Sequence, residues 1–140
     1  MSSTRRRFTL IELMVVISII GLLATIVSVS VIDSLIGARQ KVAKAEIRTL
    51  ADAVKLFKME YHRLPRNLDE LLDPPVIGNR RRAPLLESAP IDPWDRPYLF
   101  ERKGASYDIS TLGASGEPGG EGEETDFRWS ELKRSRTRGG

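Results

Sequence analysis

The feature that most constrains this chain is an uncharged run of twenty residues at positions 13–32. The run is rich in Ile, Val and Leu, and as a helix it would span about 30 Å, the thickness of a bilayer core. A secretory signal peptide would have a shorter apolar region followed by an A-x-A-like cleavage site, and neither is present. The run therefore predicts a retained membrane helix.

An acidic residue, Glu12, lies at the edge of this run, and three arginines precede it at residues 5–7. These arginines account for the whole formal net charge of +3, so the rest of the chain is neutral and its charge gives no indication of nucleic-acid binding. Basic residues flank both ends of the run, which leaves its orientation open on charge alone.

Beyond the run, apolar residues recur at alternating intervals of three and four: Ile47, Leu50, Val54, Phe57 and Tyr61. This spacing places them on one stripe of a helix. Pro65 should stop that helix near Tyr61, because proline disfavours helical geometry in the residue before it. With the apolar run, this predicts one helix of about fifty residues, with Gly37 as a point of interruption. The stripe should pack against a small head, a coiled-coil partner being the alternative.

Two local patterns indicate the structure of the head. Residues 67–72 (NLDELL) resemble a capping box that starts a short helix, with Asn67 as the cap and Glu70 returning to it. Residues 97–102 and 107–110 flank the turn KGAS and predict a hairpin in a small antiparallel sheet.

The segment 113–126 (GASGEPGGEGEETD) has five glycines, five acidic residues and no basic residue. Glycines let a backbone turn so that carbonyl and carboxylate oxygens converge on a cation such as Ca²⁺. The alternative is a flexible acidic loop in water, since the spacing of an EF-hand is not present.

No catalytic pattern is visible. Neither G-x-S-x-G, H-E-x-x-H nor a P-loop occurs, and the single histidine, His62, has a poor context for a general base. The chain has no cysteine, which excludes a disulfide framework and a thiolate metal site. Asp92 and Asp95 lie in a proline-rich turn, where aspartates typically bond to nearby backbone. We therefore do not expect an enzyme.

Four segments, in order, carry a resemblance: residues 8–24 (FTLIELMVVISIIGLLA), 61–73 (YHRLPRNLDELLD), 89–100 (APIDPWDRPYLF) and 107–129 (YDISTLGASGEPGGEGEETDFRW). The first is similar to the class III signal of type IV pilins and type II secretion pseudopilins. Together the four resemble the major, G-type pseudopilins. The resemblance implies an α+β, type IV pilin-like fold, in which a long N-terminal helix packs on a small antiparallel sheet with a glycine-rich acidic loop.

Together with the local patterns, the resemblance divides the chain into five parts: a basic leader open to cleavage at 1–7, a transmembrane and assembly helix at 8–32, an amphipathic helix at 33–61, a globular head at 62–129 and a basic disordered tail at 130–140. In the family, a prepilin peptidase cuts before the residue matching Phe8 and methylates it. Arg7 stands where the family usually has glycine.

The same family gives Glu12 a role, since it would become the fifth residue after cleavage. That glutamate is thought to meet the N-terminal amine of a neighbouring subunit during filament assembly. An unpaired acid in a bilayer costs about 2.5 to 3.5 kcal/mol on insertion scales, so pairing would relieve a penalty. The alternative is a Glu12 side chain near enough to the interface to stay hydrated.

The resemblance also implies calcium in the acidic loop, with four candidate ligands: Leu112, Ser115, Glu124 and Asp126. Ser115 stands where an aspartate is usual, so the site should be weakened by one charged ligand. Asp95 replaces the glycine of the family's DPWG turn, where we expect a positive φ that aspartate tolerates better than most residues.

By resemblance, the chain is a structural subunit of a type II secretion pseudopilus that drives protein export across the outer membrane. It would cross the inner membrane once, with the N-terminus cytoplasmic and the head periplasmic. The implied partners are further copies in a homopolymer, minor pseudopilins, the prepilin peptidase and the inner-membrane assembly platform. The alternatives are a minor pilin of a type IV pilus or competence system and a membrane-anchored binding domain that does not polymerise. A membrane-tethered hydrolase would lack a base and nucleophile pair.

Overall fold

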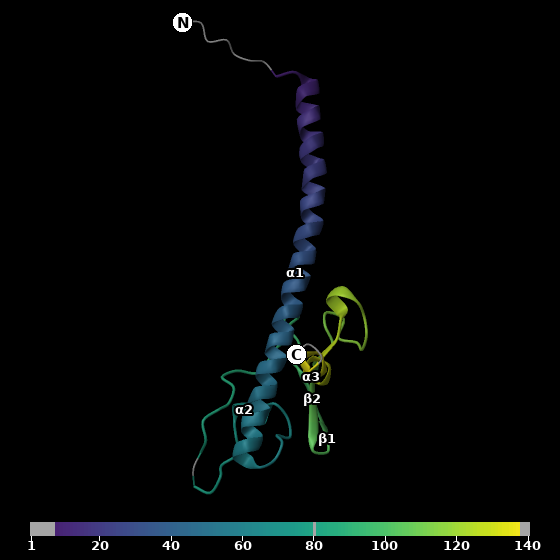
Figure 1. Cartoon of the computed structure of the whole chain (residues 1–140). Helices are drawn as coiled ribbons and strands as arrows, with labels where there is room; N and C mark the ends of the chain where they lie inside the picture. The colour runs from purple at the N-terminus through teal and green to yellow at the C-terminus, as the bar shows by residue number, and fades with distance from the viewer. Residues whose placement is uncertain (1–7, 80, 138–140) are drawn as a thin grey trace, which may run out of the picture. The chain divides into compact units, whose positions relative to one another are not determined.

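The computed structural model describes residues 8–79 and 81–137, except the side chains of residues 26–30 and 136 (Figure 1). The chain divides into two compact units, one ending at Ile36 and the other beginning at Gly37.

Helix α1 (Leu10–Tyr61) has 52 residues. It begins with a cap that was not predicted from the sequence. The hydroxyl of Thr9 accepts a hydrogen bond from the backbone N–H of Glu12 at 3.2 Å, as in the forward half of a capping box. The helix continues through Gly37, so the predicted interruption is wrong. One glycine inside a long helix costs only about 1 kcal/mol, which the neighbouring turns can offset.

The predicted end of α1 at Tyr61 is confirmed. His62 follows with φ of 53°, the left-handed conformation that commonly terminates a helix. Pro65 lies buried three residues further on.

The first unit is an exposed apolar helix. Each large apolar side chain among residues 8–23 is between 45% and 78% exposed. Considering only the residues that the structure describes, we find no helix with the combined length and hydropathy of a membrane span.

The core of the second unit forms around the predicted stripe. Ile47, Leu50, Val54 and Phe57 are buried, and Tyr61 stacks on Phe57 with ring centroids 4.3 Å apart. They cluster with the buried side chains that the sheet and the turn before it contribute: Tyr98, Ile109 and Phe127. The stripe therefore packs against the chain's own head, as predicted.

The sheet has three antiparallel strands in the order β1-β2-β3. Strand β1 (Leu99–Lys103) and strand β2 (Ser106–Thr111) form the predicted hairpin, with Leu99 opposite Ser110. Gly104 provides a positive φ of 62° in the tight turn between them. Strand β3 (Phe127–Arg128) pairs with the end of β2. The expected α+β architecture is thus present.

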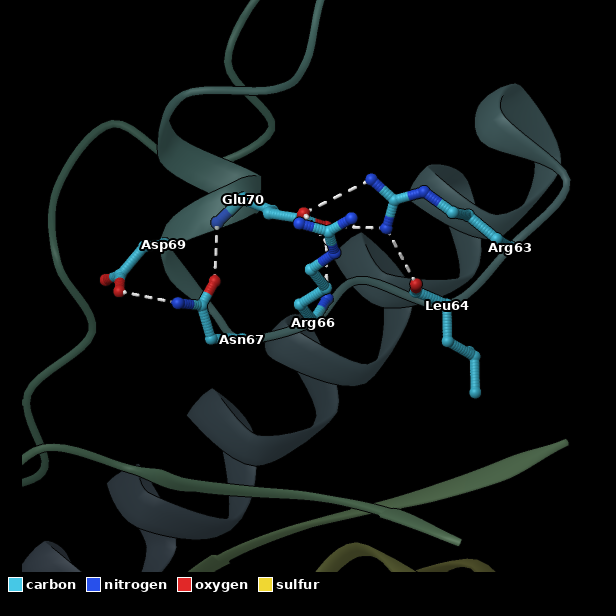
Figure 2. A network of polar contacts seen from close by, with 6 residues as sticks. All are labelled: Arg63, Leu64, Arg66, Asn67, Asp69 and Glu70. Atoms are coloured by element: carbon cyan, nitrogen blue, oxygen red, sulfur yellow. Dashed lines mark hydrogen bonds and ion pairs between the residues drawn. The ribbon is translucent and has the colours of Figure 1, made fainter. Parts of the chain in front are cut away.

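Helix α2 (Asp69–Leu72) carries the predicted capping box in one direction only (Figure 2). Asn67 Oδ1 accepts the backbone N–H of Glu70 at 3.3 Å. The Glu70 carboxylate does not return to Asn67 but accepts the backbone N–H of Arg66 at 3.0 Å and two guanidinium donors of Arg63 at 2.7 and 3.2 Å. Two arginines therefore redirect the second half of the box, and they tie α2 to the segment leaving α1.

The predicted disordered tail at 130–140 is wrong as far as Thr137, because helix α3 (Trp129–Thr137) occupies this segment. Residues 138–140 lie outside the described residues. The helix is held by contacts that its basic composition does not reveal. Trp129 and Leu132 pack on the core, while the Asp108 carboxylate accepts the backbone N–H and hydroxyl of Ser130 at 3.0 and 2.8 Å.

Candidate functional site

Two regions carry the predicted site residues, and the first is the start of α1. Arg7 lies outside the described residues. Phe8 is 77% exposed and precedes the helix. Glu12 lies in the first helical turn, where the positive end of the helix dipole favours an acid. Within the described residues, its exposed carboxylate forms no hydrogen bond or ion pair and is open to an external partner.

Thr9 also gives Glu12 a local role. The segment T-L-I-E at residues 9–12 matches the sequence signature of a capping box, and this signal could have identified the start of the helix. Only the backbone N–H of Glu12 is used by the cap, so the carboxylate stays free for other contacts.

The second region is the acidic loop, which contains the short 3-10 helix η1 (Gly122–Glu124). Glu123 Oε1 forms an ion pair with the guanidinium of Arg39 and accepts the indole N–H of Trp94 at 3.1 Å. Gln40 Nε2 donates to the carbonyl of Gly122 at 2.5 Å. These contacts fix η1 against α1, so the loop is anchored.

Glu123 is not identifiable from the sequence pattern alone. It is one of five acids in the loop, and nothing in the local pattern distinguishes it from the others. Its partner Arg39 lies 84 residues earlier.

Arg96 holds the other side of the loop. Its guanidinium donates to the carbonyl of Ala114 at 2.8 Å. The same guanidinium occupies the space that a Cβ at Gly116 would need, and Gly116 has φ of 72°. A side chain at position 116 would therefore displace the Arg96 guanidinium and would be strained at this φ.

The turn that positions Arg96 is organised by Asp92, which is 4% exposed. Asp92 Oδ1 accepts the backbone N–H groups of Trp94 and Arg96 at 3.0 and 2.9 Å, and Oδ2 accepts the hydroxyl of Thr111. Local backbone bonding is thus confirmed for Asp92. Asp95 has φ of 62°, as its place in the turn predicted.

The structure brings the two ends of the acidic loop together. The backbone N–H of Ala114 donates to the carbonyl of Glu123 at 3.0 Å, and a Cβ at Gly113 would lie 2.8 Å from that same oxygen. Ser115 Oγ lies 3.4 Å from the carbonyl oxygen of Leu112. Leu112 and Ser115 are therefore in contact, on a segment that is bonded to the residue before Glu124.

Asp126 has one satisfied and one unsatisfied oxygen. Oδ2 accepts the backbone N–H of Gly119 at 3.0 Å, whereas Oδ1 is buried and has no hydrogen-bond partner among the described residues. The Glu124 side chain is exposed, and no hydrogen bond joins Glu124 or Asp126 to Ser115 in the part of the chain that the structure describes.

Two models of known protein families match this chain. The model of the family "Type II secretion system (T2SS), protein G" matches residues 30–129, and that of the prokaryotic N-terminal methylation motif matches residues 8–28. The chain belongs to the type II secretion system protein G family. The family predicted from the four sequence segments is confirmed.

Relatives in the protein G family cover nearly the whole chain. Type II secretion system core protein G of Escherichia coli K12 is 32% identical over 143 residues, covering 93% of this chain and 96% of the relative. The protein of the same name from Pseudomonas aeruginosa is 34% identical over 129 residues, covering 86% of this chain and 91% of the relative.

A solved structure supports the fold of this protein G family member. The major pseudopilin of the type 2 secretion system of enterohaemorrhagic Escherichia coli matches with a TM-score of 0.52 at 20% identity, covering 66% of this chain and 87% of that one. The pilin-like α+β fold is thereby confirmed. The family is structural, and type II secretion pseudopilins with the methylation motif are membrane-anchored pseudopilus components that a prepilin peptidase processes.

The loop residues of this family member suit calcium in part. All the candidate donors are oxygens, as Ca²⁺ prefers, and Asp126 Oδ1 is a buried acceptor that a cation would satisfy. Over the described ranges, no three acidic or histidine side chains are gathered as a metal cluster. A calcium ion would therefore depend on carbonyl and hydroxyl oxygens as well as carboxylates.

Proposed function

We propose that this chain is the repeating subunit of a type II secretion pseudopilus rather than an enzyme. Polymerisation from the inner membrane would push secreted proteins across the outer membrane. The observation that carries the proposal is an exposed apolar helix that precedes a packed head. Apolar side chains along residues 8–23 need a cover of lipid or neighbouring helices, because a surface this apolar is unfavourable in water.

We assign the membrane-spanning part to the same helix. Residues 13–32 lie in the inner membrane before assembly, with the N-terminus cytoplasmic and the head periplasmic. The methylation motif over residues 8–28 supports this placement. The partners are other copies of the chain, minor pseudopilins, the prepilin peptidase and the inner-membrane assembly platform.

Glu12 is the assembly contact in this proposal. Cleavage between Arg7 and Phe8 releases an amine four residues before Glu12, and methylation keeps that amine basic. The Glu12 carboxylate of one copy pairs with the amine of a neighbour as their helices pack. Its exposure and its freedom from partners among the described residues support this role.

The test uses Glu12→Gln, which keeps the size of the side chain and removes its charge. We expect normal membrane insertion and no filaments in electron micrographs of sheared cells that carry the secretion machinery. Thr9→Ala is the matched control, because it removes the helix cap and leaves the acid in place. Normal filaments from Glu12→Gln would refute the assembly role of Glu12. Loss of filaments in Thr9→Ala alone would show that assembly needs the helix cap and not the Glu12 carboxylate.

We propose, as a second property, that the acidic loop binds Ca²⁺. Leu112, Ser115, Glu124 and Asp126 would hold the ion. When bound, it would neutralise the carboxylates and tie the ends of the loop together. The unsatisfied Oδ1 of Asp126 supports this proposal.

Thermal unfolding with Ca²⁺, Mg²⁺ and chelator tests the calcium proposal. A ligand selective for the folded state must stabilise it, by about 2.7 kcal/mol at a concentration one hundred times its Kd. We expect Ca²⁺ alone to raise the melting temperature, and Asp126→Asn to abolish the rise. Asp69→Asn, an exposed acid outside the loop, is the control. A melting temperature that is indifferent to Ca²⁺ and chelator would refute the site.

A further inference from the structure

A basic cleft lies on the head, between α1, the β1–β2 hairpin and α3. Its volume is about 580 Å³. The charged residues that line it are Lys55, Lys58, Lys103, Lys133, Arg134 and Asp108. Five of these residues are basic. The single acid, Asp108, already accepts two hydrogen bonds from Ser130.

The positive charge of this cleft is only partly offset by neighbours. Lys55 pairs with Asp52 at 3.5 Å and Lys103 pairs with Glu101 at 3.0 Å, and all four side chains are more than half exposed. Such exposed pairs are weak. Among the described residues, the amines of Lys58 and Lys133 form no ion pair.

The acidic loop provides the complementary charge. Glu117 and Glu121 are exposed, and their carboxylates form no hydrogen bond or ion pair among the described residues. They are not among the candidate calcium ligands. They therefore remain available to an external basic surface, with or without an ion in the loop.

The anchored part of the loop lies away from the cleft of its own chain. Arg39 and Gln40 anchor η1 to one part of α1, whereas Lys55 and Lys58 line the cleft further along the same helix. At 1.5 Å per residue these two parts of α1 are separated by roughly 25 Å. A second copy, shifted along the helix direction, would bring its loop to this cleft.

We infer that the basic cleft of one copy receives the acidic loop of another, through Glu117 and Glu121 opposite Lys133 and Arg134. This inference rests on the proposed pseudopilus, since it needs copies arranged side by side. It gives α3 a function, which its basic composition alone did not suggest. Because the contact joins exposed charges, it should weaken as salt rises above physiological ionic strength.

Cysteine crosslinking tests the contact, because the chain has no cysteine of its own. Two differently tagged full-length copies are co-expressed with the secretion machinery, one carrying Glu121→Cys and the other Lys133→Cys, and membranes are treated with a short bismaleimide. The control replaces Lys133→Cys with Arg66→Cys, whose side chain is 81% exposed and lies outside the cleft. We expect a mixed-tag dimer several-fold more abundant than in the control and reduced by salt.

Charge reversal provides the second measurement. Here the cysteine of the first copy is moved from residue 133 to Lys103→Cys, which also lines the cleft. Adding Lys133→Glu and Arg134→Glu to this copy should abolish its crosslinking to Glu121→Cys in the second copy. Adding Glu117→Lys to the second copy should restore the crosslinking. Filaments are scored separately by electron microscopy. Filaments without excess crosslinking would overturn the contact and leave the pseudopilus standing, whereas crosslinking without filaments would support the contact and overturn the pseudopilus. Loss without restoration would also overturn the contact and indicate another acidic partner, such as anionic lipid.

Discussion

At the scale of single residues, Asp92 holds three donors inside the head: the N–H groups of Trp94 and Arg96 and the hydroxyl of Thr111. Removing the carboxylate would leave one buried donor, the hydroxyl of Thr111, and two part-buried backbone donors without a partner. Asp92→Ala should therefore lower the free energy of unfolding by about 3 kcal/mol in urea titrations. Thr111→Val removes one of these three bonds and the bond that the Thr111 hydroxyl accepts from the backbone N–H of Gly113 at 3.3 Å, so it should cost about 2 kcal/mol. Equal losses from the two variants would contradict this account.

Replacing Asp95 should have the opposite effect on stability, because its φ of 62° disfavours a residue with a side chain. Asp95→Gly should raise the free energy of unfolding by up to about 1 kcal/mol, which is 4 to 8 °C in melting temperature for a head of this size. Asp95→Val should lower it, since a β-branched residue is strained at this φ. A loss of stability in the glycine variant would show that the Asp95 side chain makes a contribution of its own.

These two aspartates differ from Glu123 in how far the sequence could predict them. Two of the three bonds to Asp92 lie within one turn, where residue type and nearby prolines predict them, and the positive φ of Asp95 was expected from the resemblance. Glu123 acts on Arg39 and Trp94, which are 84 and 29 residues away. Only the fold brings these residues together.

At the scale of elements, the same contrast holds. The end of α1, the hairpin and the start of α2 follow from local capping, spacing and turn signals, and the structure has them where they were predicted. Helix α3 was missed because its anchor on Asp108 is 22 residues away, and a run rich in arginine and lysine without an apolar stripe resembles a solvated tail.

The Glu70 network makes the stability of the α1–α2 connection depend on pH (Figure 2). Burial alone would raise the pKa of Glu70, but hydrogen bonds and charge from Arg63, with the backbone N–H of Arg66, hold this pKa below its usual value of 4.5. A carboxyl whose pKa is lower in the folded state stabilises the fold above the unfolded pKa, and this stability is lost as pH falls through the folded pKa.

We therefore expect wild-type stability to fall below about pH 4.5, and part of that fall to be absent in Glu70→Gln. Denaturant unfolding between pH 3 and 7 measures the difference. Asp69→Asn, on the neighbouring exposed acid, is the control for removing a carboxylate from α2. Identical pH profiles for wild type and Glu70→Gln would show that Glu70 does not contribute to acid sensitivity.

At the scale of the whole molecule, the two units suit different surroundings. The head buries its own apolar stripe and presents charged surfaces, while the described apolar side chains of residues 8–23 are covered by nothing in their own unit. Family membership and this exposed helix together lead to a filament subunit. In the proposed function, assembly depends on the release of an amine at Phe8, which follows Arg7 in the sequence.

Intact mass of the chain recovered from sheared filaments tests this central step most directly. We predict a chain that begins at Phe8, lacks residues 1–7 and carries one added methyl group. Filaments built from full-length, unmethylated chains would contradict the account, because Arg7 would still be bonded to Phe8 and Glu12 would have no neighbouring amine to meet.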